Sequence, residues 1–248
     1  MNTKSTRRRK VGAMIALVGF ILIIFGKLLA AAVLLAASAH AAPNSDGRLY
    51  GDPTGAAEYW HPQHTGDCGL MAVADIVGQF TGKSPTEQQI IALAEQTPSV
   101  VRPGQPVWTP PTDPNDITTA SGSKAPDEVV LLAKLRIDAV VTDIKIAATS
   151  DGIPTGLEAL ERYLAGGHKV LVHLDSGALY GQGKPTYTNH VVVVTGVDTT
   201  AAVVHLNDSL DTHGDTTFSI DTFMKAWSTT DKEKIEPPYT MVVTVDAT

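Results

Sequence analysis

The chain has 248 residues, 43% of them hydrophobic, enough for one ordinary core but not for two full domains once a targeting segment is set aside. Six of the 19 Lys and Arg residues and none of the 26 Asp and Glu residues lie within positions 1–27, so the remainder carries 13 positive and 26 negative side chains, a net charge of −13. Such a surface argues against binding to nucleic acids or to anionic lipid headgroups.

The first 42 residues have the order of an export signal. Basic residues at positions 4–10 precede an apolar run over 11–39, and Ala39-His40-Ala41 resembles a signal-cleavage site of small residues. The run is also long enough for a bilayer, which takes about 20 residues, so an uncleaved membrane anchor is the alternative. Either way the basic end stays in the cytoplasm, and we expect a protein secreted or anchored to the outer face of the cytoplasmic membrane.

After a Gly-, Pro- and Asp-rich lead-in at 43–58, the sequence predicts one domain over 59–248. A helix is expected to begin at Asp67 or Cys68, because apolar residues follow at helical spacing and the Asp67 side chain can cap the first turn. Ser84-Pro85-Thr86-Glu87 predicts the start of a second helix with its serine as the capping residue.

The segment 97–126 contains seven prolines and little periodicity. Irregular segments of this length in a compact domain are commonly functional loops. We expect this one to border a substrate cleft, with Trp108 as a substrate contact; a plain surface loop is the alternative.

The second half of the chain mixes helices with strands rich in β-branched residues. Helices are predicted at 127–136, 155–165 and 221–227, and strands at 138–142, 169–174, 190–197, 201–207 and 239–245. Early helices followed by a mostly antiparallel sheet predict an α+β fold, with the N-terminal helices packed on the sheet.

Cys68 is the only cysteine, so the chain can form no internal disulfide. At the start of a helix, unsatisfied backbone N–H groups and the positive end of the dipole stabilise a thiolate. Asp67 opposes this effect with its negative charge, and Gly69 leaves room for a substrate backbone beside the sulfur. The alternative role of a lone cysteine is that of a small buried hydrophobe.

A reactive cysteine needs a base, and the predicted hairpin favours His190 among the eight histidines. If Val197 pairs with Ala201, His190 lies directly opposite Asp208, whose carboxylate can orient the imidazole. Asn207 points to the other face unless a bulge intervenes, and it is the alternative partner. The alternative interpretation is that His190 and Asp208 only lie at the ends of two strands and have no catalytic role.

These motifs, in this order, resemble the C39-like (papain-like) cysteine peptidase family. Gln63 precedes Asp67-Cys68-Gly69, His190 opens a strand that ends in Gly196-Val197-Asp198, and Asp208 closes the next strand. Residues 219–227 also resemble the family's closing helix. The resemblance implies a papain-like fold in which Cys68 is the nucleophile, His190 the general base, Asp208 its orienting partner and Gln63 the oxyanion-hole side chain.

The resemblance implies an exported cysteine peptidase that acts on peptide or protein substrates. Two alternatives remain open: a peptidoglycan amidase or endopeptidase of the cysteine type, and an inactive binding module on a peptidase fold. Glycine follows Cys68, whereas peptidoglycan hydrolases tend to have Ser-Gly there. No His, Cys or carboxylate cluster has the spacing of a zinc site, so neither a metal nor a cofactor is predicted.

Overall fold

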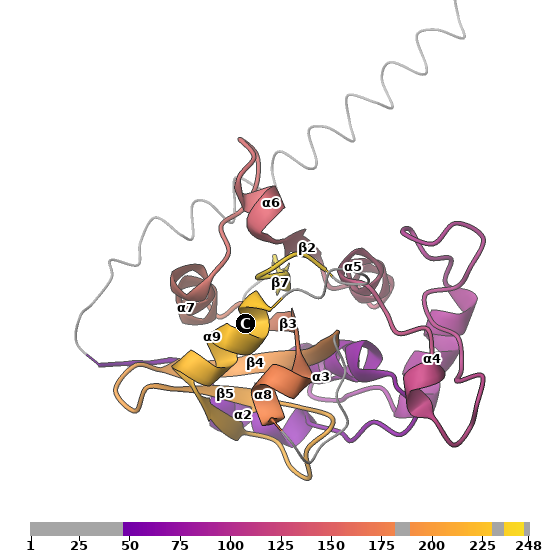
Figure 1. Ribbon diagram of the computed structural model, residues 1–248, viewed down its shortest axis with the longest axis horizontal. Helices are drawn as coiled ribbons and strands as arrows, with labels where there is room; N and C mark the ends of the chain where they lie inside the picture. The colour runs from indigo at the N-terminus through magenta and orange to yellow at the C-terminus, as the bar shows by residue number, and fades with distance from the viewer. Residues whose placement is uncertain (1–46, 182–188, 230–235, 246–248) are drawn as a thin grey trace, which may run out of the picture. The chain divides into compact units, whose positions relative to one another are not determined.

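The structure is a computed structural model that describes residues 47–181, 189–229 and 236–245. The predicted signal or anchor at 1–42 lies outside these ranges. Within them, no helix has the length and apolar character needed to cross a bilayer. The described residues belong to one compact unit, which is shown in Figure 1.

Helices and strands form close to the positions that the hydrophobic patterns predict. The helices are α2 (Pro53–Ala56), η1 (Ala57–Tyr59), α3 (Cys68–Thr81), α4 (Glu87–Gln96), η2 (Ile117–Thr119), α5 (Ala125–Lys134), α6 (Ile144–Ala147), α7 (Leu157–Ala165), α8 (Ser176–Tyr180) and α9 (Ile220–Ser228). The strands are β1 (Leu49–Gly51), β2 (Ala139–Thr142), β3 (Val170–Leu174), β4 (His190–Asp198), β5 (Val203–Asn207), β6 (Thr216–Ser219) and β7 (Met241–Thr244).

The strands form one antiparallel sheet in the order β2-β7-β3-β4-β5-β6. β1 pairs with the C-terminal end of β4, so the segment set apart as a lead-in contributes a strand to this sheet. The α+β fold class is therefore confirmed. Two short strands, β1 and β6, and the short helices α2, η1, η2, α6 and α8 were not predicted, because elements of three to five residues leave too little periodicity to detect.

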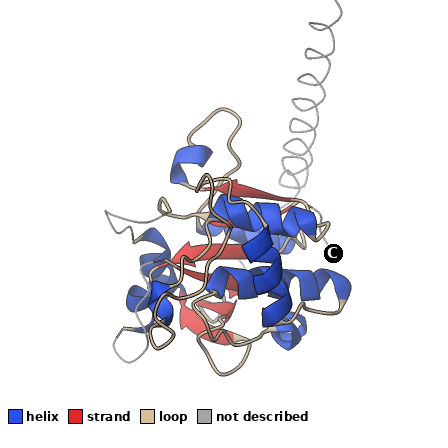
Figure 2. Ribbon diagram, turned by 90° about the vertical axis from the view of Figure 1, so that its right-hand side faces the viewer, coloured by secondary structure: helices blue, strands red, loops and turns tan. Residues whose placement is uncertain are grey.

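The sheet is covered by helices, which Figure 2 shows around the central strands. α3 packs against β3 and β4, while α9 packs against β3, β5 and β6. Val191 and Val193 of β4 join the hydrophobic core with α3, and the intervening Val192 and Val194 are buried as well. Burial of successive side chains requires cover on both faces, which explains the unbroken valine run of β4.

Both predicted helix caps differ from the structure. The Asp67 side chain makes no capping hydrogen bond to α3, although its carbonyl accepts from the N–H groups of Leu70 and Met71. In α4 the capping residue is Thr86 and not Ser84. Thr86 forms a capping box with Gln89, whose side chain accepts from the Thr86 N–H at 2.9 Å.

The expectation that Trp108 contacts substrate is wrong. Its side chain is only 2% exposed and belongs to the hydrophobic core, and its indole N–H donates to the carbonyl of Gly66 at 3.5 Å. Arg102 closes the surrounding loop through hydrogen bonds to the carbonyls of Ser121 and Gly122 at 3.0 and 3.1 Å. Trp108, in the middle of segment 97–126, therefore packs against the turn that leads into α3.

Asn207 ties the end of β5 to α3 from within the core. Its amide donates to the carbonyl of Ala56 at 2.8 Å and to Oδ2 of Asp75 at 2.7 Å, and its Oδ1 accepts from the Asp215 N–H at 3.0 Å. Asp75 also accepts from Gln79 at 2.6 Å. Burial raises the pKa of Asp75 to about 7 despite these amide donors.

We expect Asn207→Ala to lower the free energy of unfolding by about 3 kcal/mol, because it leaves buried hydrogen-bonding groups without partners. Urea denaturation monitored by circular dichroism measures this change. Asn115→Ala, which removes an exposed asparagine from a surface turn, is the control and should change stability by less than about 0.5 kcal/mol. Equal stability of the two variants would contradict the role assigned to Asn207.

Candidate active site

Cys68 is the first residue of α3, and its side chain is partly exposed. The first N–H groups of a helix have no partners within it, and they face a group at this position. Near the same turn, burial and then the neighbouring Glu87 carboxylate raise the pKa of Asp67 to about 6. Asp67 is consequently protonated at a higher pH than an ordinary aspartate. In its protonated form it does not repel a thiolate nearby.

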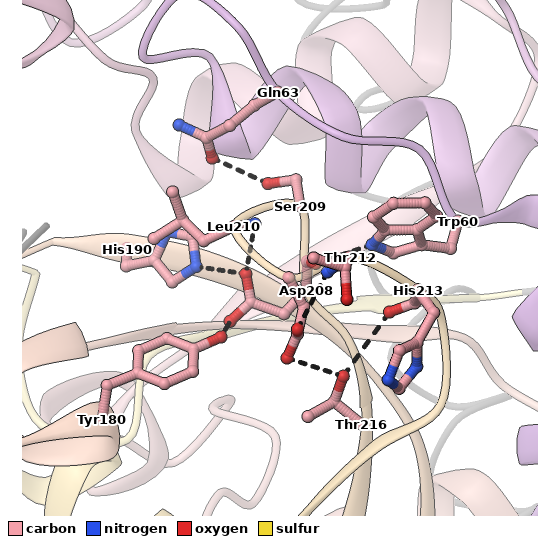
Figure 3. A network of polar contacts seen from close by, with 11 residues as sticks. Trp60, Gln63, Tyr180, His190, Asp208, Ser209, Leu210, Thr212, His213 and Thr216 are labelled. Carbon is pink, nitrogen blue, oxygen red and sulfur yellow. Dashed lines mark hydrogen bonds and ion pairs between the residues drawn. The ribbon is translucent and has the colours of Figure 1, made fainter. Parts of the chain in front are cut away.

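His190 and Asp208 form a fully buried pair. His190 Nε2 lies 2.7 Å from Asp208 Oδ1, and both side chains are 0% exposed. Asp208 Oδ1 also accepts from the backbone N–H of Leu210 at 2.8 Å. Figure 3 shows the imidazole held against the carboxylate at the end of β5. Because Asp208 engages Nε2, the ring nitrogen for proton exchange with a nucleophile is Nδ1.

The protonation states of this pair follow from burial and mutual charge. Burial lowers the pKa of His190, but the Asp208 carboxylate reverses this effect and, with a smaller contribution from the nearby Cys68 side chain, raises it to about 10. Burial raises the pKa of Asp208, but His190 and the hydrogen bond from Tyr180 hold it below its usual value. The structure thus favours an imidazolium beside Cys68, and a positive neighbour stabilises a thiolate.

The strand register predicted for this hairpin was wrong. Val197 pairs with Val204 and not with Ala201, and the register shifts again at a bulge between Val194 and Gly196. After the bulge the ladder is offset from the predicted one by two residues, which keeps Asp208 on the same face as His190. Asp208 is therefore a diagonal neighbour of His190 and not its direct opposite, within reach of its side chain.

Tyr180 is a member of this site that the sequence analysis missed. Its phenol O–H donates to Asp208 Oδ2, while Trp60 donates its indole N–H to the Asp208 carbonyl at 2.6 Å. Burial and then the Asp208 charge raise the pKa of Tyr180, which keeps the phenol protonated as a donor. No sequence motif marks Tyr180, because only the fold brings α8 to the end of β5.

Gln63 lies above the same strand end, oriented by Ser209 (Figure 3). The Ser209 hydroxyl donates to Gln63 Oε1 at 2.7 Å, and the Gln63 backbone N–H donates to the Ser209 carbonyl at 3.0 Å. With its oxygen held by Ser209, the Gln63 amide directs its NH₂ group the other way and can donate to a ligand.

Gly69 does not leave open space at its Cβ position for a substrate backbone, the role expected from the sequence. A Cβ built on it would lie 2.0 Å from the Ser123 hydroxyl and 2.5 Å from Glu128 Oε1. A side chain at position 69 would therefore displace Ser123 and Glu128, so the packing of α3 on α5 and on the loop that precedes α5 accounts for glycine here.

The model of the Peptidase_C39 like family matches residues 57–235 of this chain. The chain belongs to the C39-like peptidase family. Uncharacterized proteins of Mycobacterium bovis and of two strains of Mycobacterium tuberculosis are 43% identical to it over 210 residues, which cover 81% of this chain and 89% of each relative.

A crystal structure of a Bacillus anthracis protein described as a C39-like peptidase matches with a TM-score of 0.52 and 15% identity, over 80% of this chain and 98% of the other. This likeness shows the shared fold. The match of the family model begins at the start of η1 and extends beyond α9, so it includes Gln63, Cys68, His190 and Asp208.

The raised pKa of His190 predicts how Asp208 affects stability as the pH changes. The His190 contribution to stability is fully present below pH 6.5 and is lost as the pH rises through about 10. The difference in unfolding free energy between wild type and Asp208→Asn should therefore shrink as the pH rises from 6.5 to 10. Urea denaturation at a series of pH values measures this difference, and a difference that grows over this range would contradict the assignment.

Asp215→Asn is the matched control for this experiment. It removes the carboxylate of another His–Asp pair, His205 and Asp215, whose facing atoms lie 2.6 Å apart with side chains 17% and 34% exposed. Solvent screens such a pair, so its loss should have a smaller and flatter effect across the same pH range.

Proposed function

We propose that this C39-like protein is a cysteine peptidase that hydrolyses peptide bonds through Cys68, His190 and Asp208. The observation that carries the proposal is the buried His190–Asp208 pair beside the partly exposed Cys68 at the start of α3. A structural histidine would need only the carboxylate. Here the ring also lies close enough to Cys68 to respond to its charge, as a base serving a nucleophile must.

In the proposed reaction the Cys68 thiolate attacks the peptide carbonyl carbon and forms a C–S bond. The backbone N–H of Cys68 and the Gln63 side-chain amide donate to the oxyanion that develops. When the C–N bond breaks, His190 gives its Nδ1 proton to the leaving amine. Water then attacks the thioester carbon and gives a proton to His190. The C–S bond breaks, which releases the carboxylic acid and restores the Cys68 thiolate.

Asp208 holds the imidazole in position and stabilises its positive form throughout this cycle. Hydrogen bonds donated by Tyr180, Trp60 and Leu210 hold Asp208 in position. Asn207, the alternative partner, is committed to Ala56 and Asp75 on the other side of the strand.

The packing of Gly69 bears on the peptidoglycan-hydrolase alternative. A serine after the nucleophile, as in the Ser-Gly pattern of those enzymes, would place its Cβ against Ser123 and Glu128. The chain thus lacks the Ser-Gly pattern expected of those enzymes, which agrees with the peptidase assignment. Digestion of purified cell wall without release of muropeptides would agree with it as well.

We also propose that the protein is exported, on the evidence of the basic and apolar N-terminal segment and the net charge of −13 beyond it. Intact-mass spectrometry of protein from the producing cell reads the N-terminus directly. A mass that lacks about the first 42 residues indicates a cleaved signal, whereas a full-length mass in the membrane fraction indicates an anchor.

The proposed nucleophile can be tested with iodoacetamide, because Cys68 is the only thiol. We expect folded protein to be alkylated at pH 6 at least about tenfold faster than protein unfolded in urea, since an ordinary thiol is mostly protonated there. His190→Ala should remove this difference. Equal rates in the folded and unfolded states would favour the inactive binding module.

Gln63→Ala should lower kcat for a cleaved peptide by about 10²- to 10³-fold, the effect of losing one oxyanion donor, while Cys68→Ala should abolish turnover. Ser209→Ala should cause a smaller loss than Gln63→Ala, because it frees the amide without removing it. Peptides from a digested protein mixture, followed by mass spectrometry, supply the substrate. Wild-type turnover by Gln63→Ala would exclude an oxyanion role for this side chain.

A further inference from the structure

A second buried His–carboxylate pair lies beside the candidate active site. His173 Nε2, from β3, is 2.8 Å from Oε2 of Glu128, from α5, and the two side chains are 1% and 0% exposed. The reaction proposed above uses neither residue.

This pair extends at both ends through hydrogen bonds. Ser123 donates its hydroxyl to Glu128 Oε1 at 2.8 Å, and His173 Nδ1 lies 3.0 Å from Asn189 Oδ1. Burial lowers the pKa of His173, but the Glu128 carboxylate outweighs this effect and raises it to about 9. An imidazolium donates from both ring nitrogens, so it satisfies Glu128 and Asn189 together.

Both ends of this chain of contacts reach residues adjacent to the proposed catalytic pair. Asn189 immediately precedes His190. Gly69, which immediately follows Cys68, packs so closely that an added Cβ would lie 2.0 Å from Ser123 and 2.5 Å from Glu128. The contacts therefore join the backbone beside the nucleophile to the backbone beside the base.

We propose that Glu128 and His173 are positioning residues that set the separation of Cys68 and His190 by holding the chain next to each of them. This inference rests on the proposed function. A buried ion pair contributes little net stability compared with apolar side chains of the same volume. Stabilisation of the fold alone therefore does not account for a charged pair at this place.

The test measures alkylation of Cys68 by iodoacetamide between pH 5 and 10 in wild type, Glu128→Gln and Asp215→Asn. We expect Glu128→Gln to slow alkylation at pH 7 by about 10- to 100-fold, the scale of a displacement of about 1 Å. The deficit should shrink above about pH 9, where an ordinary thiol ionises unaided. Asp215→Asn, which alters the partly exposed His205–Asp215 pair, should match wild type.

The outcomes separate the two proposals. If wild type shows no enhanced alkylation over its urea-unfolded state, the proposed function fails. If wild type is enhanced and folded Glu128→Gln reacts at the same rate across the pH range, only the positioning role is overturned. If Glu128→Gln does not fold, Ser123→Ala tests the positioning role in its place. Loss of the hydrogen bond from Ser123 to Glu128 should slow alkylation at pH 7 by about fivefold. An unchanged rate overturns the positioning role.

Discussion

The buried pair formed by His190 and Asp208 constrains the architecture around it. Two facing charges removed from water are tolerated only where further hydrogen bonds satisfy their remaining atoms. Asp208 meets this demand by accepting from Tyr180 of α8, from the Leu210 backbone and, at its carbonyl, from Trp60. Elements from distant parts of the chain therefore have to converge on the end of β5.

The three residues at that strand end divide their contacts between three directions. Asn207 faces α3 and holds Asp75, Asp208 faces His190, and Ser209 holds Gln63. Alternation of side chains along a strand separates the first two roles. Residues 207–209 thus contact the core, the proposed base His190 and the proposed oxyanion donor Gln63. A shift of this short segment would move both proposed catalytic groups.

Periodicity was sufficient to predict the long helices and strands of this domain, and the family motifs led to Gln63, Cys68, His190 and Asp208. The hairpin register was not predictable, because neither the Asp198–Val203 closure nor the bulge near Thr195 has a sequence signature. Together, the different closure and the bulge shift the strand pairing by two residues. Asp208 therefore stays on the same face of the sheet as His190, as predicted, although the predicted register was wrong. Trp108 and Gly69 were misread because only tertiary packing reveals their neighbours.

The contacts that build this site span nearly the whole domain. Trp60 meets Asp208 across 148 positions, and Gln63 meets Ser209 across 146. A chain that emerges from the ribosome N-terminus first therefore presents the Cys68 thiol more than a hundred residues before the His190 imidazole follows. The order of synthesis therefore keeps the nascent polypeptide without the proposed triad until Asp208 has also been added.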